Sequence, residues 1–375
     1  MQKWSLIFVL LCFLVTALCG GSKLYLQKRN PPDFAVRQGQ IFDGYVSIDF
    51  YCHRAAKVKR ALTGQSDPNL TESLARKDIL HPTSWLVPVA VALVSSITAS
   101  IPVAFFVLSL SALFAQAWLI RLLVFEICGH AALLFANCAA VVFLSHITTI
   151  RSAGQFYLDP FVSTAALAAV LLTFRILRSP AKKVAGLGLA ALQASALFLK
   201  SSYLPWLAAP ALLAFVGCKE GRLATTLRFG LLYGVLPLVP ALIFLNVAHG
   251  ELQSATKDMA DLASSWTLSS GELKRFALEM VLLFQWLPLA FVFTLRPRDS
   301  RILGLLLCLA LVLLSVWSFR LPAIARLYLP VLSVLVAACF AHLAGRVSER
   351  AVIAMVVVHA AINYAFAAYV LLHHV

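Results

Sequence analysis

The sequence is poor in charged residues, which make up 13% of the chain, whereas a soluble domain carries about one quarter. Hydrophobic residues make up 61%, more apolar surface than one globular core could bury, so a soluble protein is excluded. Long apolar runs recur throughout, and many approach the ~20 residues that cross a bilayer. Such runs also exclude a membrane barrel, whose strands are short and alternating. They predict an all-α polytopic membrane protein with one transmembrane domain over residues 1–375.

Cysteines with a recognisable paired spacing are also absent. Seven of the eight cysteines lie in or beside apolar segments, and only Cys52 lies in a long polar loop. The pattern therefore indicates neither a disulfide framework nor a zinc site. Internal repeats are typical of transporters, and the chain has no convincing internal repeat.

Acidic residues are scarce, which leaves a formal net charge of +15. The basic residues gather in short clusters at the ends of apolar segments, as they do in cytoplasmic loops. These clusters lie at 175–183, 219–228, 296–301 and 346–350. We therefore expect membrane lipids or a phosphate-bearing substrate as partners, and no nucleic acid.

The positive-inside rule limits the number of spans. The apolar segments are 5–20, 84–99, 101–123, 129–150, 160–177, 184–200, 203–217, 229–247, 276–295, 302–318, 327–344 and 351–371. If all cross with the N-terminus inside, the four basic clusters fall outside, against the rule. Segment 84–99 is short and contains Pro88, so we expect it to be interfacial or re-entrant, which leaves about 11 transmembrane helices. In the alternative topology all the segments cross and the N-terminus lies outside.

The first loop is the longest polar stretch and, with segment 84–99, forms an outer region over residues 21–100, before the later helices of 101–371. Within it, residues 49–63 combine an apolar stripe with a basic face, which predicts an interfacial helix that ends at Gly64. Asp49 begins this helix. A carboxylate held at the bilayer surface is a candidate general base.

Polar residues gather on the outer side of the eleven-span topology. They are Asp49, His81, Gln155, Asp159, Lys200, Arg320 and Arg326. Such a set suits a phosphate-linked substrate, because cations hold the phosphate and a carboxylate accepts a proton. Simpler interpretations exist: Asp159 could cap its helix, and Lys200 could extend to the membrane interface. His146 and His359 lie near or within spans and form no i, i+4 pair.

The same residues carry a family resemblance between about 45 and 345. The matching steps, in order, are Asp49-Phe50-Tyr51 through Leu62-Thr63-Gly64, His81-Pro82, Gly154-Gln155 with Leu158-Asp159-Pro160-Phe161, Leu199-Lys200 with Tyr203-Leu204-Pro205, and Arg326-Leu327-Tyr328-Leu329-Pro330. In these steps the chain resembles the polyprenol-phosphate-mannose-dependent mannosyltransferases of glycosyltransferase family 87, and the related protein mannosyltransferase and aminoarabinose transferase group. Both groups belong to the GT-C class of membrane glycosyltransferases.

The resemblance implies a GT-C-like bundle with interfacial helices in the first outer loop. It implies inverting transfer of a mannose-like sugar from polyprenyl phosphate to a hydroxyl of a lipid, glycan or protein acceptor, without a metal or other cofactor. Asp49 would be the general base, and Asp159 would orient the acceptor or the surroundings of Asp49. The substrate-binding residues would be Tyr51, Arg54, His81, Gln155, Tyr157, Lys200, Arg320 and Arg326. The site would face the extracytoplasmic side, with a bacterial inner membrane as the expected location.

Two other functions stay open. A transporter or lipid flippase should show repeats and broken spans near the bilayer midplane. A polysaccharide ligase or polymerase would also use a polyprenyl-linked donor. Its usual sign is a large late outer loop, whereas the corresponding loop at 248–275 is of moderate length.

Overall fold

The computed structural model describes residues 2–29, 48–64, 86–98, 100–153, 158–179, 183–218, 220–249, 270–292, 300–318 and 328–373. The secondary structure in these residues is all helical, as the apolar runs predict. Among them, five helices are long and apolar enough to cross a membrane, and several shorter apolar helices accompany them. The chain is therefore a multi-pass helical membrane protein.

The long apolar elements are distributed along the whole chain. They are α1 (Gln2–Arg29), α6 (Ile101–Cys128), α9 (Asp159–Arg178), the continuous stretch of α12 (Arg222–Gly230), π-helical η3 (Leu231–Val235) and α13 (Leu238–His249), and α19 (Glu349–His373). The other elements are α3 (Ile48–Leu62), α5 (Leu86–Thr98), η1 (His130–Ala132), α7 (Leu133–Ser145), α8 (Ile147–Ser152), α10 (Lys183–Leu197), η2 (Ser201–Ala208), α11 (Ala209–Gly217), α15 (Ser270–Phe284), α16 (Leu289–Val292), α17 (Ser300–Ser318) and α18 (Leu329–Leu343).

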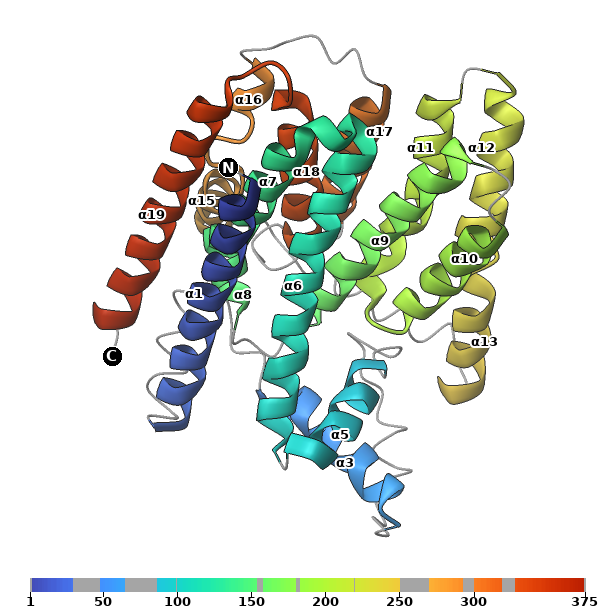
Figure 1. Cartoon of the computed structure of the whole chain (residues 1–375). Helices are drawn as coiled ribbons and strands as arrows, with labels where there is room; N and C mark the ends of the chain where they lie inside the picture. The colour runs from blue at the N-terminus through green and yellow to red at the C-terminus, as the bar shows by residue number, and fades with distance from the viewer. Residues whose placement is uncertain are drawn as a thin grey trace.

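Two short helices form the centre of the bundle. Every residue of α18 is buried, and so is every residue of α7 after Leu133. Helix α18 packs against α6, α7, α9 and α17, and lies between them in Figure 1. A helix that is apolar on all sides belongs inside a bundle, where its neighbours cover it.

The apolar segment 129–150 does not form the single span that the sequence predicts. Helix α7 ends at Ser145, and α8 begins at Ile147. Between them His146 has extended backbone, and its Nδ1 accepts a hydrogen bond of 3.2 Å from the Thr148 backbone N–H. This side chain caps the second helix and satisfies one of its free backbone N–H groups at the break.

Helices α3 and α5 lie apart from the long helices. In Figure 1 they lie together beside the beginning of α6, below the other helices, and α5 packs against both α3 and α6. The helix predicted over 49–63 is present as α3, and it is followed by Gly64 with a φ of +70°. The 13 residues of α5 extend only about 20 Å at 1.5 Å per residue, less than the ~30 Å hydrocarbon layer.

Several basic side chains gather at one end of the bundle. Glu126, near the end of α6, accepts a 3.2 Å bond from Arg178 and lies 3.8 Å from Arg175, both near the end of α9. Arg301, at the beginning of α17, donates to the Glu126 carbonyl over 3.3 Å. We call this the basic end, where α12 also begins and α18 connects to α19 (Figure 1). The opposite end, with α3, α5 and the beginnings of α6 and α9, is called the α3 end.

Candidate functional site

Asp159 and Lys200 form a buried ion pair at the α3 end. The Lys200 ammonium donates to Asp159 Oδ1 over 2.8 Å, and the two side chains are 3% (Asp159) and 6% (Lys200) exposed. The residues are 41 positions apart in the chain, so the packing of α9 against α10 and η2 brings them together. The structure thus joins a carboxylate and a cation that the sequence predicts as separate parts of one site.

Local backbone geometry explains why both side chains point inward. Asp159 is the first residue of α9, and Pro160 follows it in the first turn, where a missing N–H costs nothing. The N-cap is Leu158, so the interpretation of Asp159 as a helix cap is wrong. Lys200 has extended backbone between α10 and η2 and is only 4% exposed, so the interpretation that it extends to the interface is also wrong.

Neighbouring helices fix the beginning of α9, and with it Asp159. The Pro160 carbonyl accepts hydrogen bonds from Gln116 Nε2 of α6 over 2.9 Å and from the Thr164 hydroxyl over 2.8 Å. One turn further, the Ser163 and Ser333 hydroxyls share a hydrogen bond of 3.1 Å, which joins α9 to α18. The carboxylate therefore stands on backbone that is held from two other helices.

An apolar cluster attaches α3 and α5 to the same end of the bundle. Ala55 of α3 and Phe105 of α6 are fully buried in it, together with Leu158, the residue before Asp159. Leu199, the residue before Lys200, packs against the cluster. The backbone N–H of Leu86, the first residue of α5, donates to the Phe198 carbonyl over 3.4 Å. The helix that carries Asp49 therefore packs at the end that holds the ion pair.

For the other predicted site residues, the structure describes either the backbone alone or nothing. Asp49, Tyr51 and Arg54 belong to the first turns of α3, and their side chains are outside the described part. The remaining predicted residues lie outside the described residues altogether, and they are His81, Gln155, Tyr157, Arg320 and Arg326. Their places in a site stay predictions.

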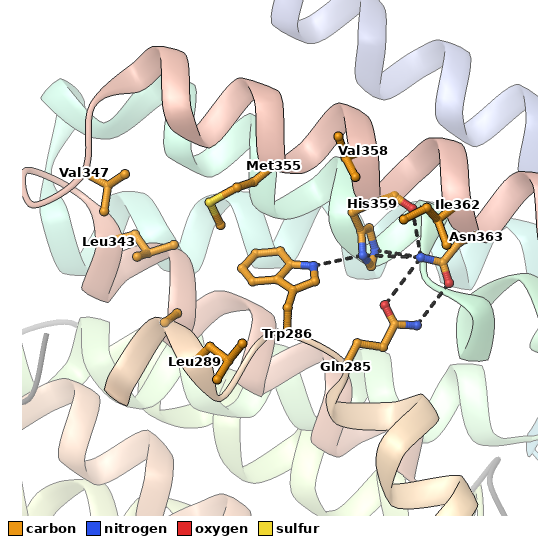
Figure 2. A pocket seen from close by; sticks show the side chains of 11 residues that line it. Gln285, Trp286, Leu289, Leu343, Val347, Met355, Val358, His359, Ile362 and Asn363 are labelled. Carbon is orange, nitrogen blue, oxygen red and sulfur yellow. Dashed lines mark hydrogen bonds between the residues drawn. The ribbon is translucent and has the colours of Figure 1, made fainter. Parts of the chain in front are cut away.

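Sequence reasoning missed a second buried polar group, which joins α19 to the break between α7 and α8. The Asn363 amide oxygen accepts bonds from the Ile147 backbone N–H over 3.2 Å and from Gln285 Nε2 over 3.0 Å. Figure 2 shows the Trp286 indole N–H directed at His359, whose Nδ1 accepts it over 3.1 Å. The signal was available, because His359 and Asn363 are four residues apart on an apolar helix. A search for histidine pairs at that spacing passes over a histidine followed by an asparagine.

The hydrogen-bond directions give this group a structural role. The His359 Nδ1 accepts from Trp286, and its Nε2 lies 3.3 Å from the Val142 carbonyl, so the ring is the neutral tautomer with Nε2–H. A cavity of about 640 Å³ lies beside the group, and its wall is mostly apolar, with Leu289, Met355 and Val358 (Figure 2). The group itself links three segments of the chain through neutral hydrogen bonds.

No protein-family model matches the chain, and neither does any curated protein. Within the described residues, no group of three or more histidine, cysteine, aspartate or glutamate side chains could hold a metal ion. Geometry and residue chemistry therefore carry the functional conclusion. They define a multi-pass helical membrane protein with a buried ion pair at one end of its bundle.

Proposed function

We propose that this protein is a GT-C-type membrane glycosyltransferase that moves a mannose-like sugar from polyprenyl phosphate to an acceptor hydroxyl. The observation that carries the proposal is the buried Asp159–Lys200 pair, at the end where the Asp49 helix packs. In the proposed topology about 11 helices cross the bilayer. Helices α3 and α5 lie at its extracytoplasmic surface, in a bacterial inner membrane.

A buried ion pair is a poor device for stability, because the cost of removing two charges from water offsets their attraction. Ionisable residues inside membrane bundles therefore mark functional sites by default. The place of this pair argues against the transporter alternative, whose site should lie near the midplane between repeats. Its position at one end of the bundle supports a site near the bilayer surface, where a lipid-linked phosphate would enter in this proposal.

The proposed chemistry divides the work between two carboxylates and several cations. Asp49 accepts the proton of the acceptor hydroxyl while that oxygen attacks the anomeric carbon. The bond between the anomeric carbon and the phosphate oxygen breaks, and polyprenyl phosphate leaves with the electron pair. Lys200, oriented by Asp159, stabilises the charge on the leaving phosphate, together with Arg320 and Arg326.

The remaining residues bind the sugar and the acceptor in this proposal. Aromatic rings at Tyr51 and Tyr157 contact the sugar, and hydrogen-bonding groups orient it, namely Arg54, His81 and Gln155. The donor phosphate is already a good leaving group, so the proposed reaction requires no metal. The acceptor is a lipid, glycan or protein at the same membrane surface.

A transfer assay with purified protein tests the proposal. Polyprenyl phosphate carrying radiolabelled mannose, or another hexose, is incubated with wild type, with Asp49→Asn and with Asp33→Asn, a control in the same loop. We expect Asp49→Asn to lower transfer by about 100-fold or more, since a general base contributes 10²–10⁴-fold. The control should retain full transfer.

The outcomes separate the candidate functions. Undiminished transfer by Asp49→Asn would remove the assignment of the base. If wild type transfers no sugar from any such donor but moves labelled polyprenyl lipid across a vesicle bilayer, the protein is a flippase. Transfer of preassembled polysaccharide alone would identify a ligase or polymerase.

A further inference from the structure

A second cavity lies near the basic end, away from the ion pair. Its volume is about 770 Å³, within the range of small-molecule sites of roughly 300–1,000 Å³. It opens between α10 and the α12–α13 stretch, which lie side by side in Figure 1. Most of its wall is apolar and includes Leu177, Leu187, Leu232 and Leu236. Leu187 is 73% exposed and Leu236 is 50% exposed, so the walls continue onto the outer surface of the bundle.

A π-helix and a glycine shape one wall of this cavity. At the end of η3 the Leu236 N–H donates to the Leu231 carbonyl over 2.9 Å. This bond closes the wider π-helical turn, which recurs at functional sites. Tyr233 belongs to this turn, and its hydroxyl lies against Gly186 of α10. A Cβ at Gly186 would lie 2.9 Å from the hydroxyl oxygen, so the glycine provides the space that this hydroxyl occupies.

Arg228 gives the cavity a cationic wall. It is exposed and lines the cavity together with Thr225 and Tyr233. Arg175 and Arg178 lie beside Glu126, whereas Arg228 has no hydrogen-bond or ion-pair partner within the part of the chain that the structure describes. Its guanidinium is therefore available to an anion from outside the protein.

We propose that this cavity binds one anionic phospholipid from the leaflet at the basic end. The planar guanidinium of Arg228 suits two parallel hydrogen bonds to a phosphate. Tyr233 is five residues further along, about 7 Å deeper at helical rise, where its hydroxyl meets the ester groups below the phosphate. The acyl chain lies along the apolar walls. The basic clusters around the cavity favour a lipid with net negative charge over a zwitterionic one.

Native mass spectrometry of the purified protein tests this site directly. Wild type in detergent is titrated with dioleoyl phosphatidylglycerol and, separately, with dioleoyl phosphatidylcholine. We expect one tightly bound phosphatidylglycerol and binding of phosphatidylcholine that is weaker by about tenfold. Arg228→Gln should weaken phosphatidylglycerol binding by about tenfold, the value of one charge-assisted contact. Arg350→Gln is the matched control, because Arg350 is also exposed at the basic end but lies outside the cavity.

A second variant tests the chain-binding part. Leu187→Trp fills the cavity from its exposed side and should weaken the binding of both lipids. Equal affinity of wild type for the two lipids would overturn the proposal, as would unchanged phosphatidylglycerol binding by Arg228→Gln. An equal loss in Arg350→Gln would show general attraction to positive charge. Displacement of the lipid by millimolar inorganic phosphate would show a simple anion site. None of these results depends on transferase activity.

Discussion

Two of the buried polar groups among the described residues are built from different chemistry. The group at the α3 end consists of opposite charges, Asp159 and Lys200, joined by a bond of 2.8 Å. The group around Asn363 consists of amides, an imidazole and an indole, with complementary donors and acceptors. A neutral network can hold helices together at little cost once its bonds are made. Burying a charged pair costs free energy, because both charges lose their hydration. We therefore infer that the pair has a task that neutral residues cannot perform.

The two groups also lie in different parts of the fold. The Asn363 network joins α19, the break between α7 and α8, and the turn after α15, where Gln285 has a φ of +44°. A non-glycine residue in that conformation is strained, and two side-chain bonds between Gln285 and Asn363 help to hold it. The ion pair instead lies beside the α3 and α5 cluster, at the end where we place the reaction. We therefore assign the Asn363 network to the support of the fold, and we propose the ion pair for the chemistry.

Removing one partner of the ion pair should have the largest effect. Lys200→Met leaves the Asp159 carboxylate buried without its cation, which typically costs about 3–5 kcal/mol of stability. We also expect transfer to fall by about 100-fold or more, because the phosphate loses a stabilising charge. Thermal unfolding in detergent and the sugar-transfer assay measure the two effects. Lys274→Met at an exposed position is the control, and an unchanged melting temperature of Lys200→Met would contradict the buried pair.

A change in the Asn363 network should lower stability and leave sugar transfer unchanged. Asn363→Leu leaves the Ile147 N–H and the Gln285 side chain without their acceptor, which should lower stability by about 1–2 kcal/mol. Transfer per folded molecule should stay at the wild-type level. The adjacent substitution Ile362→Leu, on a 63% exposed side chain, controls for changes in α19. A loss of transfer in Asn363→Leu without a loss of stability would show that this group also takes part in the reaction.

Replacing Gln116 should affect both stability and transfer, but less than replacing Lys200. Gln116→Leu removes the bond to the Pro160 carbonyl beside Asp159, at a cost of about 1 kcal/mol. Transfer should fall less than in Lys200→Met, because Asp159 changes position but keeps its ion pair with Lys200. Ser111→Ala, which removes a bond within α6 on its exposed side, provides the comparison. Equal transfer by both variants would show that the beginning of α9 is positioned without Gln116.

The smallest effect should come from the basic end. Glu126→Gln removes the acidic partner of Arg175 and Arg178, whose side chains are 42% and 73% exposed. Exposed pairs of this kind contribute about 1 kcal/mol or less, and the reaction is proposed for the other end. The melting temperature should change little and transfer not at all. A marked loss of transfer would place part of the site at the basic end.

The sequence was sufficient to predict the class of fold, but it could not predict which distant residues are in contact. Apolar runs predict helices, and the helix that begins near Asp49 is present as α3. The positive-inside rule grouped the basic clusters on one side and Asp159 on the other. In the structure Arg175 and Arg178 lie at the end opposite Asp159, whereas α3 has further basic residues in its last turn at the Asp159 end. Local patterns reach only neighbouring turns, so they could not pair Asp159 with Lys200, 41 residues away. At the break at His146, the side chains of His146 and Asn363 accept backbone N–H groups, and hydrophobicity does not reveal either bond.

The double variant Asp159→Leu/Lys200→Met tests the central claim most directly, with melting temperature and sugar transfer measured on the same preparation. Replacing both charges by apolar side chains of similar size removes the desolvation cost together with the attraction. If the pair is kept for chemistry, the double variant should melt close to wild type, well above either single variant, and should transfer no sugar. A double variant that transfers sugar at the wild-type rate would contradict the account.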